Sequence, residues 1–213
     1  HGKSKVYQEI HTVELMAEKV KEVIDALKLE KINLLGHSLG GYVSLAFAEK
    51  FPEILESMTL FFSTTVADDQ EKKAIRRRSI AVIDENFETF VKTSIPNLFS
   101  NNEKDILEGK IELAKNIAKS TDKEGVKAAQ LGMAERPDRT EILENLDAKI
   151  LIIAGKYDNA VKTENLLKII PEKTNIKTYV LDCGHNGHWE KPTICAEIIN
   201  TELLHNLPKH FLL

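Results

Sequence analysis

The sequence predicts an α/β fold: a mostly parallel sheet with helices on both faces and an inserted block of helices. Short apolar runs typical of buried strands alternate with segments of helical period over residues 1–64 and 136–213. Residues 65–135 are charged and helical in period, and they contain no strand-like run. The 213 residues, 42% hydrophobic and 29% charged, suffice for one domain with a substantial core.

The first half of the alternation contains two predicted helices and two predicted strands. Apolar side chains recur at helical spacing over residues 12–28, and Thr12 is a suitable N-cap for that helix. The run KINLLG at 31–36 is short, apolar and ends at a glycine, so it predicts a buried strand. A helix is expected over 42–51, followed by a second strand over 57–62.

The inserted block and the second half follow the same rules. Within the block, helical periodicity predicts four short helices, at about 69–83, 85–93, 103–118 and 122–134. Beyond it, the alternation predicts a strand at 149–155, a helix at 163–171, a strand at 176–182 and a last helix at 193–207. The basic run Arg76–Arg78 lies among Glu and Asp, so we interpret it as a solvated helix face rather than as a site for a phosphate or an acid.

A serine stands between glycines where the first predicted strand turns into a helix. Gly36-His37-Ser38-Leu39-Gly40 fits the pattern G-x-S-x-G, in which a strained turn raises a nucleophilic serine above the sheet. Small residues two positions before and after Ser38 let the strand and the helix pass closely. The N–H of Leu39 would then point from a helix N-terminus at the same space and stabilise an oxyanion. The alternative is an ordinary strand-to-helix turn.

A serine nucleophile needs a base, and in this topology an acid and then a histidine follow it along the chain. Asp158 comes just after the strand at 149–155, and His185 just after the strand at 176–182. We therefore expect Ser38, His185 and Asp158 to form a catalytic triad at the carboxyl ends of the strands. His188 is the alternative base.

Other candidates receive lesser roles. For the acid the alternative is Asp182, which we interpret as capping its own turn. His37 is expected to line the pocket or pack beside it. Cys183 as a nucleophile with His185 would leave the serine turn unexplained. The remaining histidines precede the sheet or lie near the last helix, at positions His1, His11, His205 and His210.

Charge and cysteine usage exclude several classes of function. The net charge is −4, with 29 basic and 33 acidic residues, so no basic field is available for nucleic acid or an anionic membrane. No apolar run approaches the ~18 residues that a membrane span needs. Cys183 and Cys195 fit neither a disulfide framework nor a metal motif, which favours a reducing, cytoplasmic location. The first residues, HGKSKVYQEIH, do not form a signal peptide.

Three motifs together resemble the α/β-hydrolase superfamily over nearly the whole chain. They are GHSLGG at 36–41, GKYD at 155–158, and the run from Gly184-His185 to Glu190-Lys191-Pro192, which is similar to the family's G-H…E-x-P signature. The chain is most similar to the esterase and enol-lactonase branch. The resemblance implies that His185 is the catalytic base and that residues 65–135 form a helical lid. It also implies that four further strands, and the loop that donates the second oxyanion N–H, lie upstream of residue 1.

The expected function is therefore hydrolysis of a carboxylic ester or lactone by a serine nucleophile, without metal or cofactor, on a small-molecule substrate. The candidate pocket walls are aromatic and aliphatic side chains from the lid and one strand end, with His37: Phe61, Phe62, Phe87, Phe90, Ile95, Leu98 and Phe99. Thioesterase, C–C bond hydrolase and cofactor-free haloperoxidase-like activities share the same triad. A non-catalytic ligand-binding relative and an inactive fragment remain as further alternatives.

Overall fold

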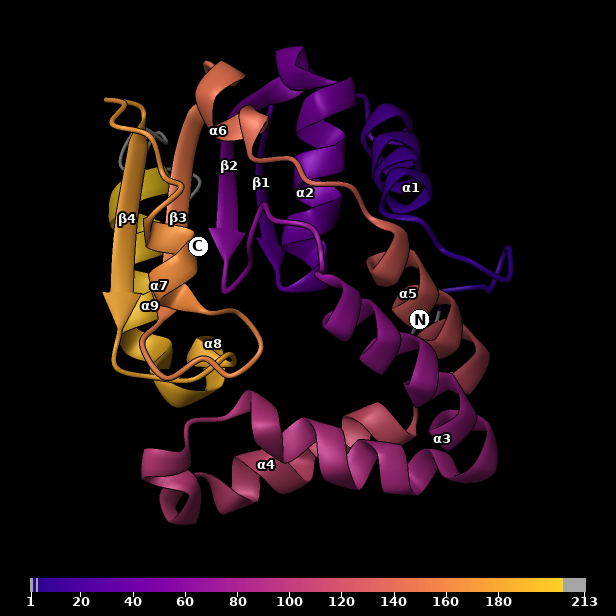
Figure 1. The fold of residues 1–213 in the computed structure, drawn as a ribbon. Helices are drawn as coiled ribbons and strands as arrows, with labels where there is room; N and C mark the ends of the chain where they lie inside the picture. Colours follow the sequence, from indigo (N-terminus) through magenta and orange to yellow (C-terminus); the bar gives the residue numbers. More distant parts are fainter. Residues whose placement is uncertain (1, 3, 205–213) are drawn as a thin grey trace.

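The sheet has four parallel strands in the order β1-β2-β3-β4, as the computed structural model of the protein shows for residues 2 and 4–204 (Figure 1). The strands are β1 (Ile32–His37), β2 (Leu55–Phe61), β3 (Lys149–Gly155) and β4 (Ile176–Leu181). One row of the register joins Leu35, Thr59, Leu151 and Lys177 across the sheet. The parallel α/β fold predicted from the alternation is confirmed.

Helices connect the strands and cover both faces. The α-helices are α1 (Val13–Ala26), α2 (Leu39–Lys50), α3 (Gln70–Ser94), α4 (Lys104–Lys119), α5 (Lys123–Glu135), α6 (Glu141–Asn145), α7 (Thr163–Leu167), α8 (Gly187–Glu190) and α9 (Pro192–Ile199). Short 3₁₀ turns are η1 (Pro52–Ile54), η2 (Ile95–Leu98) and η3 (Asn101–Glu103), and a π-helical turn, η4 (Asn200–Leu204), follows α9. None of these helices is both long and apolar enough to cross a membrane.

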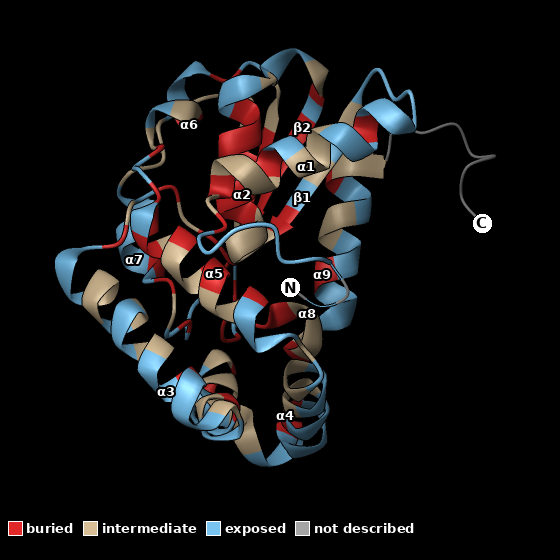
Figure 2. Ribbon diagram, turned by 90° about the vertical axis from the view of Figure 1, so that its right-hand side faces the viewer, coloured by how far each residue is buried: buried red, intermediate tan, exposed pale blue. Residues whose placement is uncertain are grey.

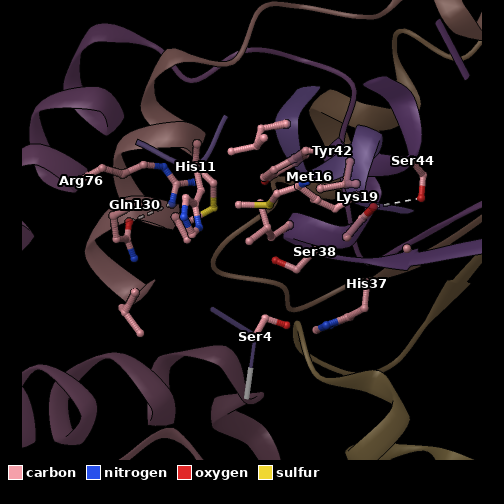
Figure 3. Close-up of a pocket in the computed structure, with 18 of the residues that line it drawn as sticks. Ser4, His11, Met16, Lys19, His37, Ser38, Tyr42, Ser44, Arg76 and Gln130 are labelled. Atoms are coloured by element: carbon pink, nitrogen blue, oxygen red, sulfur yellow. Dashed lines mark hydrogen bonds between the residues drawn. The ribbon is translucent and has the colours of Figure 1, made fainter. Parts of the chain in front are cut away.

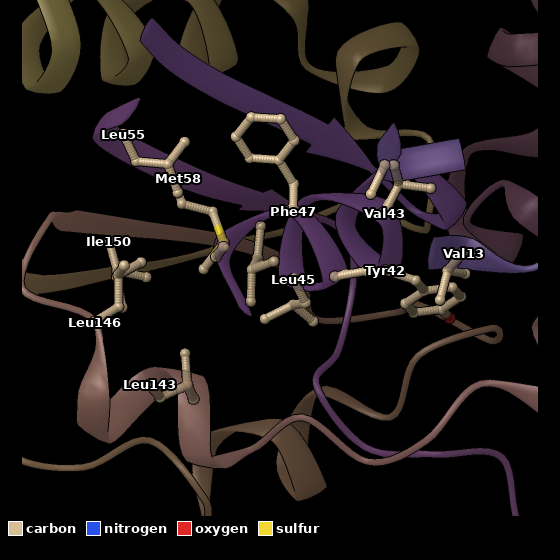
Figure 4. Packing of buried hydrophobic residues seen from close by; sticks show 14 of the residues in the cluster. Val13, Tyr42, Val43, Leu45, Phe47, Leu55, Met58, Leu143, Leu146 and Ile150 are labelled. Carbon is tan, nitrogen blue, oxygen red and sulfur yellow. The ribbon is translucent and has the colours of Figure 1, made fainter. Parts of the chain in front are cut away.

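The main core lies between one face of the sheet and α1, α2, α6 and α7 (Figure 4). Helix α2 supplies a continuous buried stretch that includes Leu45 and Phe47, because it lies against the strands along its whole length. Alternate residues of β3 face opposite sides: Ile150 and Ile152 enter this core, whereas Leu151 and Ile153 enter a second cluster under α9. The buried residues of α2 and β2 stand out in Figure 2.

The first helix begins where the sequence predicts. The Thr12 side chain accepts a hydrogen bond from the Leu15 N–H at 3.1 Å and so caps α1. Helix α2 begins at Leu39, earlier than the expected residue 42, because the sharp turn at Ser38 leads directly into the helix. The short helices α6 and α8 have too few residues to show a period, and the sequence did not predict them. The predicted last helix extends to residue 207, beyond the described residues.

The helical block, residues 65–135, covers the carboxyl ends of the strands (Figure 1). Its first helix, α3, has a non-helical residue at Asn86, and the Asn86 side chain caps the second half by accepting from the Thr89 N–H at 2.9 Å. This kink explains why the periodicity predicts two helices there. Asp68, near the start of the block, binds Arg136, the residue that follows its end, at 2.9 Å. The buried Arg136 guanidinium also stacks 3.9 Å from the centre of the Tyr42 ring in the core.

Strand β1 forms one edge of this sheet, so its outer backbone groups have no partner strand among the described residues. Alternate side chains on it are exposed, among them Leu35 at 39%. This edge opens onto the cavity described below.

Candidate active site

Ser38 occupies a strained turn between β1 and α2. Its backbone has φ 51° and ψ −114°, a conformation that costs a non-glycine residue energy and persists only when the surroundings impose it. Three contacts impose it: the Ser38 N–H donates to Phe61 O at 3.0 Å, and the Ser38 carbonyl accepts from the Gly41 N–H at 2.9 Å and the Ser63 hydroxyl at 2.8 Å. The turn therefore holds the serine hydroxyl above the sheet.

The glycines around Ser38 are not equivalent. A Cβ on Gly36 would lie 2.2 Å from Gly40 O, and a Cβ on Gly41 would lie 2.3 Å from the Ser63 hydroxyl oxygen. A Cβ on Gly40 would meet nothing within 4 Å. The close crossing of strand and helix thus requires glycine at 36, and contact with the Ser63 side chain requires it at 41. At Gly40, the second small residue of the sequence pattern, a Cβ would have room.

Ser38, His185 and Asp158 are joined in one hydrogen-bonded chain. His185 Nε2 lies 2.7 Å from Ser38 Oγ, and His185 Nδ1 lies 2.8 Å from Asp158 Oδ2. Because a carboxylate only accepts, Nδ1 carries a proton, which leaves Nε2 free to accept from the serine hydroxyl when the ring is neutral. His185 and Asp158 are 2% and 6% exposed, so water competes little for these bonds.

The loop after β3 holds the carboxylate of Asp158. Its second oxygen, Oδ1, accepts from the N–H groups of Ala160 and Val161 at 2.7 and 2.8 Å. Thr163, at the start of α7, donates its hydroxyl to Gly155 O at 2.6 Å and closes the loop. The carboxylate is therefore fixed on the side of the imidazole opposite Ser38.

The loop after β4 is held by Glu190. The Glu190 carboxylate accepts from the N–H groups of Gly184, at 2.9 Å, and Ser100, at 3.2 Å, and so joins the histidine loop to the helical block. His37 Nε2 lies 3.0 Å from the His185 carbonyl and, facing a carbonyl, must donate. Burial lowers the pKa of His37 to about 4, so the ring is neutral near pH 7.

The structure separates the alternatives from this chain of bonds. His188 packs against His37 with ring centres 4.6 Å apart, and its Nδ1 is buried without a hydrogen-bond partner. Asp182 is exposed and pairs with Lys156 at 3.3 Å. Cys183 is a buried free thiol whose pKa burial raises, which disfavours the thiolate. None of these three side chains forms a hydrogen bond with Ser38 or His185.

Leu39 is the first residue of α2, and the first N–H groups of a helix have no acceptor within it. Its N–H therefore remains available next to Ser38 for a negatively charged oxygen.

Across residues 2 and 4–204, no group of three or more His, Cys, Asp or Glu side chains could hold a metal ion.

A cavity of about 1160 Å³ opens over Ser38 (Figure 3). Of the expected pocket residues, His37, Phe90, Ile95 and Leu98 line it, with Ser38, Leu39 and His185. Phe61 and Phe62 do not line it but pack in the buried cluster under α9, and Phe99 packs against Trp189. Phe87 stacks on Phe90 but does not line the cavity.

Several cavity residues have no local sequence signal. Met16 of α1 and Met133 of α5 line the apolar part of the wall. His11, Arg76 and Gln130 form a polar part that faces the cavity (Figure 3). They come from segments far apart in the chain, so only the fold brings them together.

Comparison with known proteins identifies relatives of this architecture. The family model described as "alpha/beta hydrolase fold" matches residues 1–192. A 2-hydroxy-6-oxononadienedioate/2-hydroxy-6-oxononatrienedioate hydrolase of Escherichia coli (strain K12) is 26% identical over 185 residues, 83% of this chain and 64% of that protein. This chain spans about two thirds of the length of the curated relatives it matches.

Solved structures show the same fold. A thermophilic esterase from Thermogutta terrifontis, solved with malate bound, is 32% identical with a TM-score of 0.86, covering 94% of this chain and 75% of that one. The enol-lactonase from Burkholderia xenovorans LB400 superposes with a TM-score of 0.85 at 19% identity, over 94% of this chain and 76% of that one. The second comparison supports the fold alone.

Proposed function

Because the chain belongs to the alpha/beta hydrolase fold family and is 32% identical to an esterase, we propose that it is a serine hydrolase of carboxylic esters or lactones. The observation that carries the proposal is the bonded chain from Ser38 through His185 to Asp158, with Ser38 on a strained turn. A hydroxyl, an imidazole and a carboxylate in this order can activate a nucleophile without a metal or cofactor.

The proposed reaction has two stages. In the first, Ser38 Oγ attacks the substrate carbonyl while His185 Nε2 takes the hydroxyl proton, and Asp158 stabilises the resulting imidazolium. The Leu39 N–H donates to the oxyanion as one of its stabilising groups. His185 then gives the proton to the departing alkoxide, and the acyl group of the substrate stays bonded to Ser38. In the second stage, water activated by His185 releases the acid.

The helical block is proposed to act as a lid that shapes the substrate pocket. Phe90, Ile95 and Leu98 of the block line the cavity above Ser38. Apolar walls of this kind favour an organic acyl or alcohol group and exclude water from the reacting atoms.

Hydrolysis of p-nitrophenyl butyrate tests the proposal. We expect turnover by the wild type and a loss of at least about a thousandfold in kcat for Ser38→Ala and His185→Ala. Wild-type activity that survives in Ser38→Ala would refute the proposed nucleophile.

A C–C bond hydrolase is the second candidate, because the E. coli relative is named a 2-hydroxy-6-oxononadienedioate/2-hydroxy-6-oxononatrienedioate hydrolase. The same three side chains would serve it. Turnover of such a compound, with none of the p-nitrophenyl ester, would favour this candidate.

A further inference from the structure

Three cationic side chains share a single buried carboxylate beside the cavity. Asp68 accepts from Arg136 Nη2 at 2.9 Å and from Arg76 Nε, and Lys72 Nζ lies 3.8 Å from it. Within the described part of the chain, the ion pairs of these three cations include no other carboxylate. Lys72 and Arg76 also line the cavity, so its wall carries an excess of positive charge.

Arg76 and Gln130 form a pair of hydrogen-bond donors on this wall (Figure 3). Arg76 Nη1 lies 3.2 Å from Gln130 Oε1, and because a guanidinium only donates, the amide oxygen must face it. The amide nitrogen of Gln130 is then directed away from Arg76. Among the hydrogen bonds of residues 2 and 4–204, none uses Arg76 Nη2 or Gln130 Nε2. Free N–H groups therefore remain on both side chains.

The surroundings of Arg76 strengthen the hydrogen bonds that this pair of donors can form. The Arg76 side chain is only 14% exposed, and the apolar residues Ala129 and Met133 line the same cavity. An ion pair or charge-assisted hydrogen bond is stronger where water is excluded. Asp68 holds one edge of the guanidinium through Nε, so the rest of the group is fixed in direction.

We infer that Arg76 and Gln130 bind a carboxylate of the substrate, so that the ester or lactone cleaved at Ser38 derives from an acidic compound. The inference rests on the proposed function, because Ser38 and Arg76 line the same cavity. A planar guanidinium matches the two oxygens of a carboxylate, and the neighbouring amide adds a donor.

The burial of Arg76 departs from the sequence interpretation of the basic run as a solvated helix face, which holds for Arg77 and Arg78. Arg77 does behave in that way: its side chain is 54% exposed and pairs with Glu135 at 2.7 Å. Arg76, one position earlier on the helix, points into the cavity. Arg77→Gln is therefore a matched control, since it removes the same charge from the same helix outside the cavity.

Two esters with acyl chains of equal length test the inference by activity. They are p-nitrophenyl hydrogen glutarate, which ends in a carboxylate, and p-nitrophenyl valerate, which ends in a methyl group. Gln130→Glu adds an isosteric carboxylate beside Arg76, and Arg76→Gln removes the cation while Arg136 still binds Asp68. We expect either variant to lose about 10- to 100-fold in kcat/KM for the glutarate ester, the range for a lost charge-assisted hydrogen bond. Valerate hydrolysis should change less than about threefold, and Arg77→Gln should match the wild type.

Two kinetic results would overturn the inference. If the variants cleave the glutarate ester as well as the wild type does, the wall does not recognise charge, while valerate turnover leaves the proposed function intact. If both esters lose activity equally, the wall supports folding or catalysis rather than recognition.

A binding measurement tests the inference without turnover. Its result does not depend on whether the acyl part or the alcohol part of the substrate carries the charge. Ser38→Ala is titrated calorimetrically with glutarate and with neutral dimethyl glutarate. Preferential binding of glutarate that weakens at least tenfold on adding Arg76→Gln, but not Arg77→Gln, supports the inference even if neither ester is cleaved. Glutarate binding that is undetectable or independent of Arg76 overturns it.

Discussion

The crossing of β1 and α2 at Gly36 gives the most quantitative prediction. In Gly36→Ala the new Cβ would lie 2.2 Å from Gly40 O, 2.3 Å from Gly40 C and 2.5 Å from Gly41 N. All three are backbone atoms, so no side chain can turn aside. Ordinary contacts begin at 3.4 Å, so strand and helix must separate by about 1.2 Å, the difference between 3.4 and 2.2 Å. Overpacking that side chains can relieve costs about 1–3 kcal/mol, so we expect at least about 3 kcal/mol here.

The matched control is Gly40→Ala. Its Cβ meets nothing within 4 Å, and alanine is a better helix former than glycine, so we expect no loss or a gain of up to about 1 kcal/mol. Urea unfolding followed by circular dichroism measures both free energies of unfolding. A displacement of 1 Å at a catalytic group costs about a hundredfold in rate, so ester hydrolysis by folded Gly36→Ala should also fall. A cost below about 1 kcal/mol for Gly36→Ala, or equal costs for the two variants, would refute the steric argument.

Three further predictions concern charged and titratable groups. His185→Ala should lose at least about a thousandfold in kcat for p-nitrophenyl butyrate and His188→Ala less than about tenfold; the reverse order would contradict the assignment. Asp68→Asn leaves buried guanidinium groups without their counter-charge, so urea unfolding should show a free energy of unfolding lower by about 3–5 kcal/mol. A decrease below about 1 kcal/mol would show that Asp68 does not anchor the helical block. The hydrogen bond from Lys149 lowers the pKa of Glu202 from 4.5 to about 2, so this carboxylate stabilises the fold above pH 4.5 and loses that effect as pH falls towards 2. In Glu202→Gln the fall in melting temperature between pH 5 and 2.5 should be smaller than in the wild type, and an unchanged fall would exclude this linkage.

The elements of the sheet and the serine turn follow from local patterns, which is why the sequence predicts them. Apolar runs locate all four strands within about two residues, and the turn at Ser38 depends on glycines a few positions away. The loops carrying Asp158 and His185 are predictable because parallel strands bring their carboxyl ends to one edge. The structure brings His185 to Ser38 and Asp158 to His185.

The residues that were not predicted depend on tertiary geometry. Successive positions on a helix point about 100° apart, so the sequence cannot say which of Arg76 and Arg77 faces inward. Phe62, with φ 49°, follows the end of β2 in a conformation that strand alternation does not foresee, and it packs into the core. Gln130 acquires its proposed role only because α5 packs beside α3.

The most direct test of the central claim is covalent labelling of the nucleophile. The protein is treated with a fluorophosphonate probe, and the modified residue is located by peptide mass spectrometry in the wild type, Ser38→Ala and His185→Ala. The account predicts one adduct per chain on Ser38 in the wild type, none in Ser38→Ala, and labelling slowed at least about a hundredfold in His185→Ala. An adduct on another residue, or equal labelling rates in the wild type and His185→Ala, would contradict it.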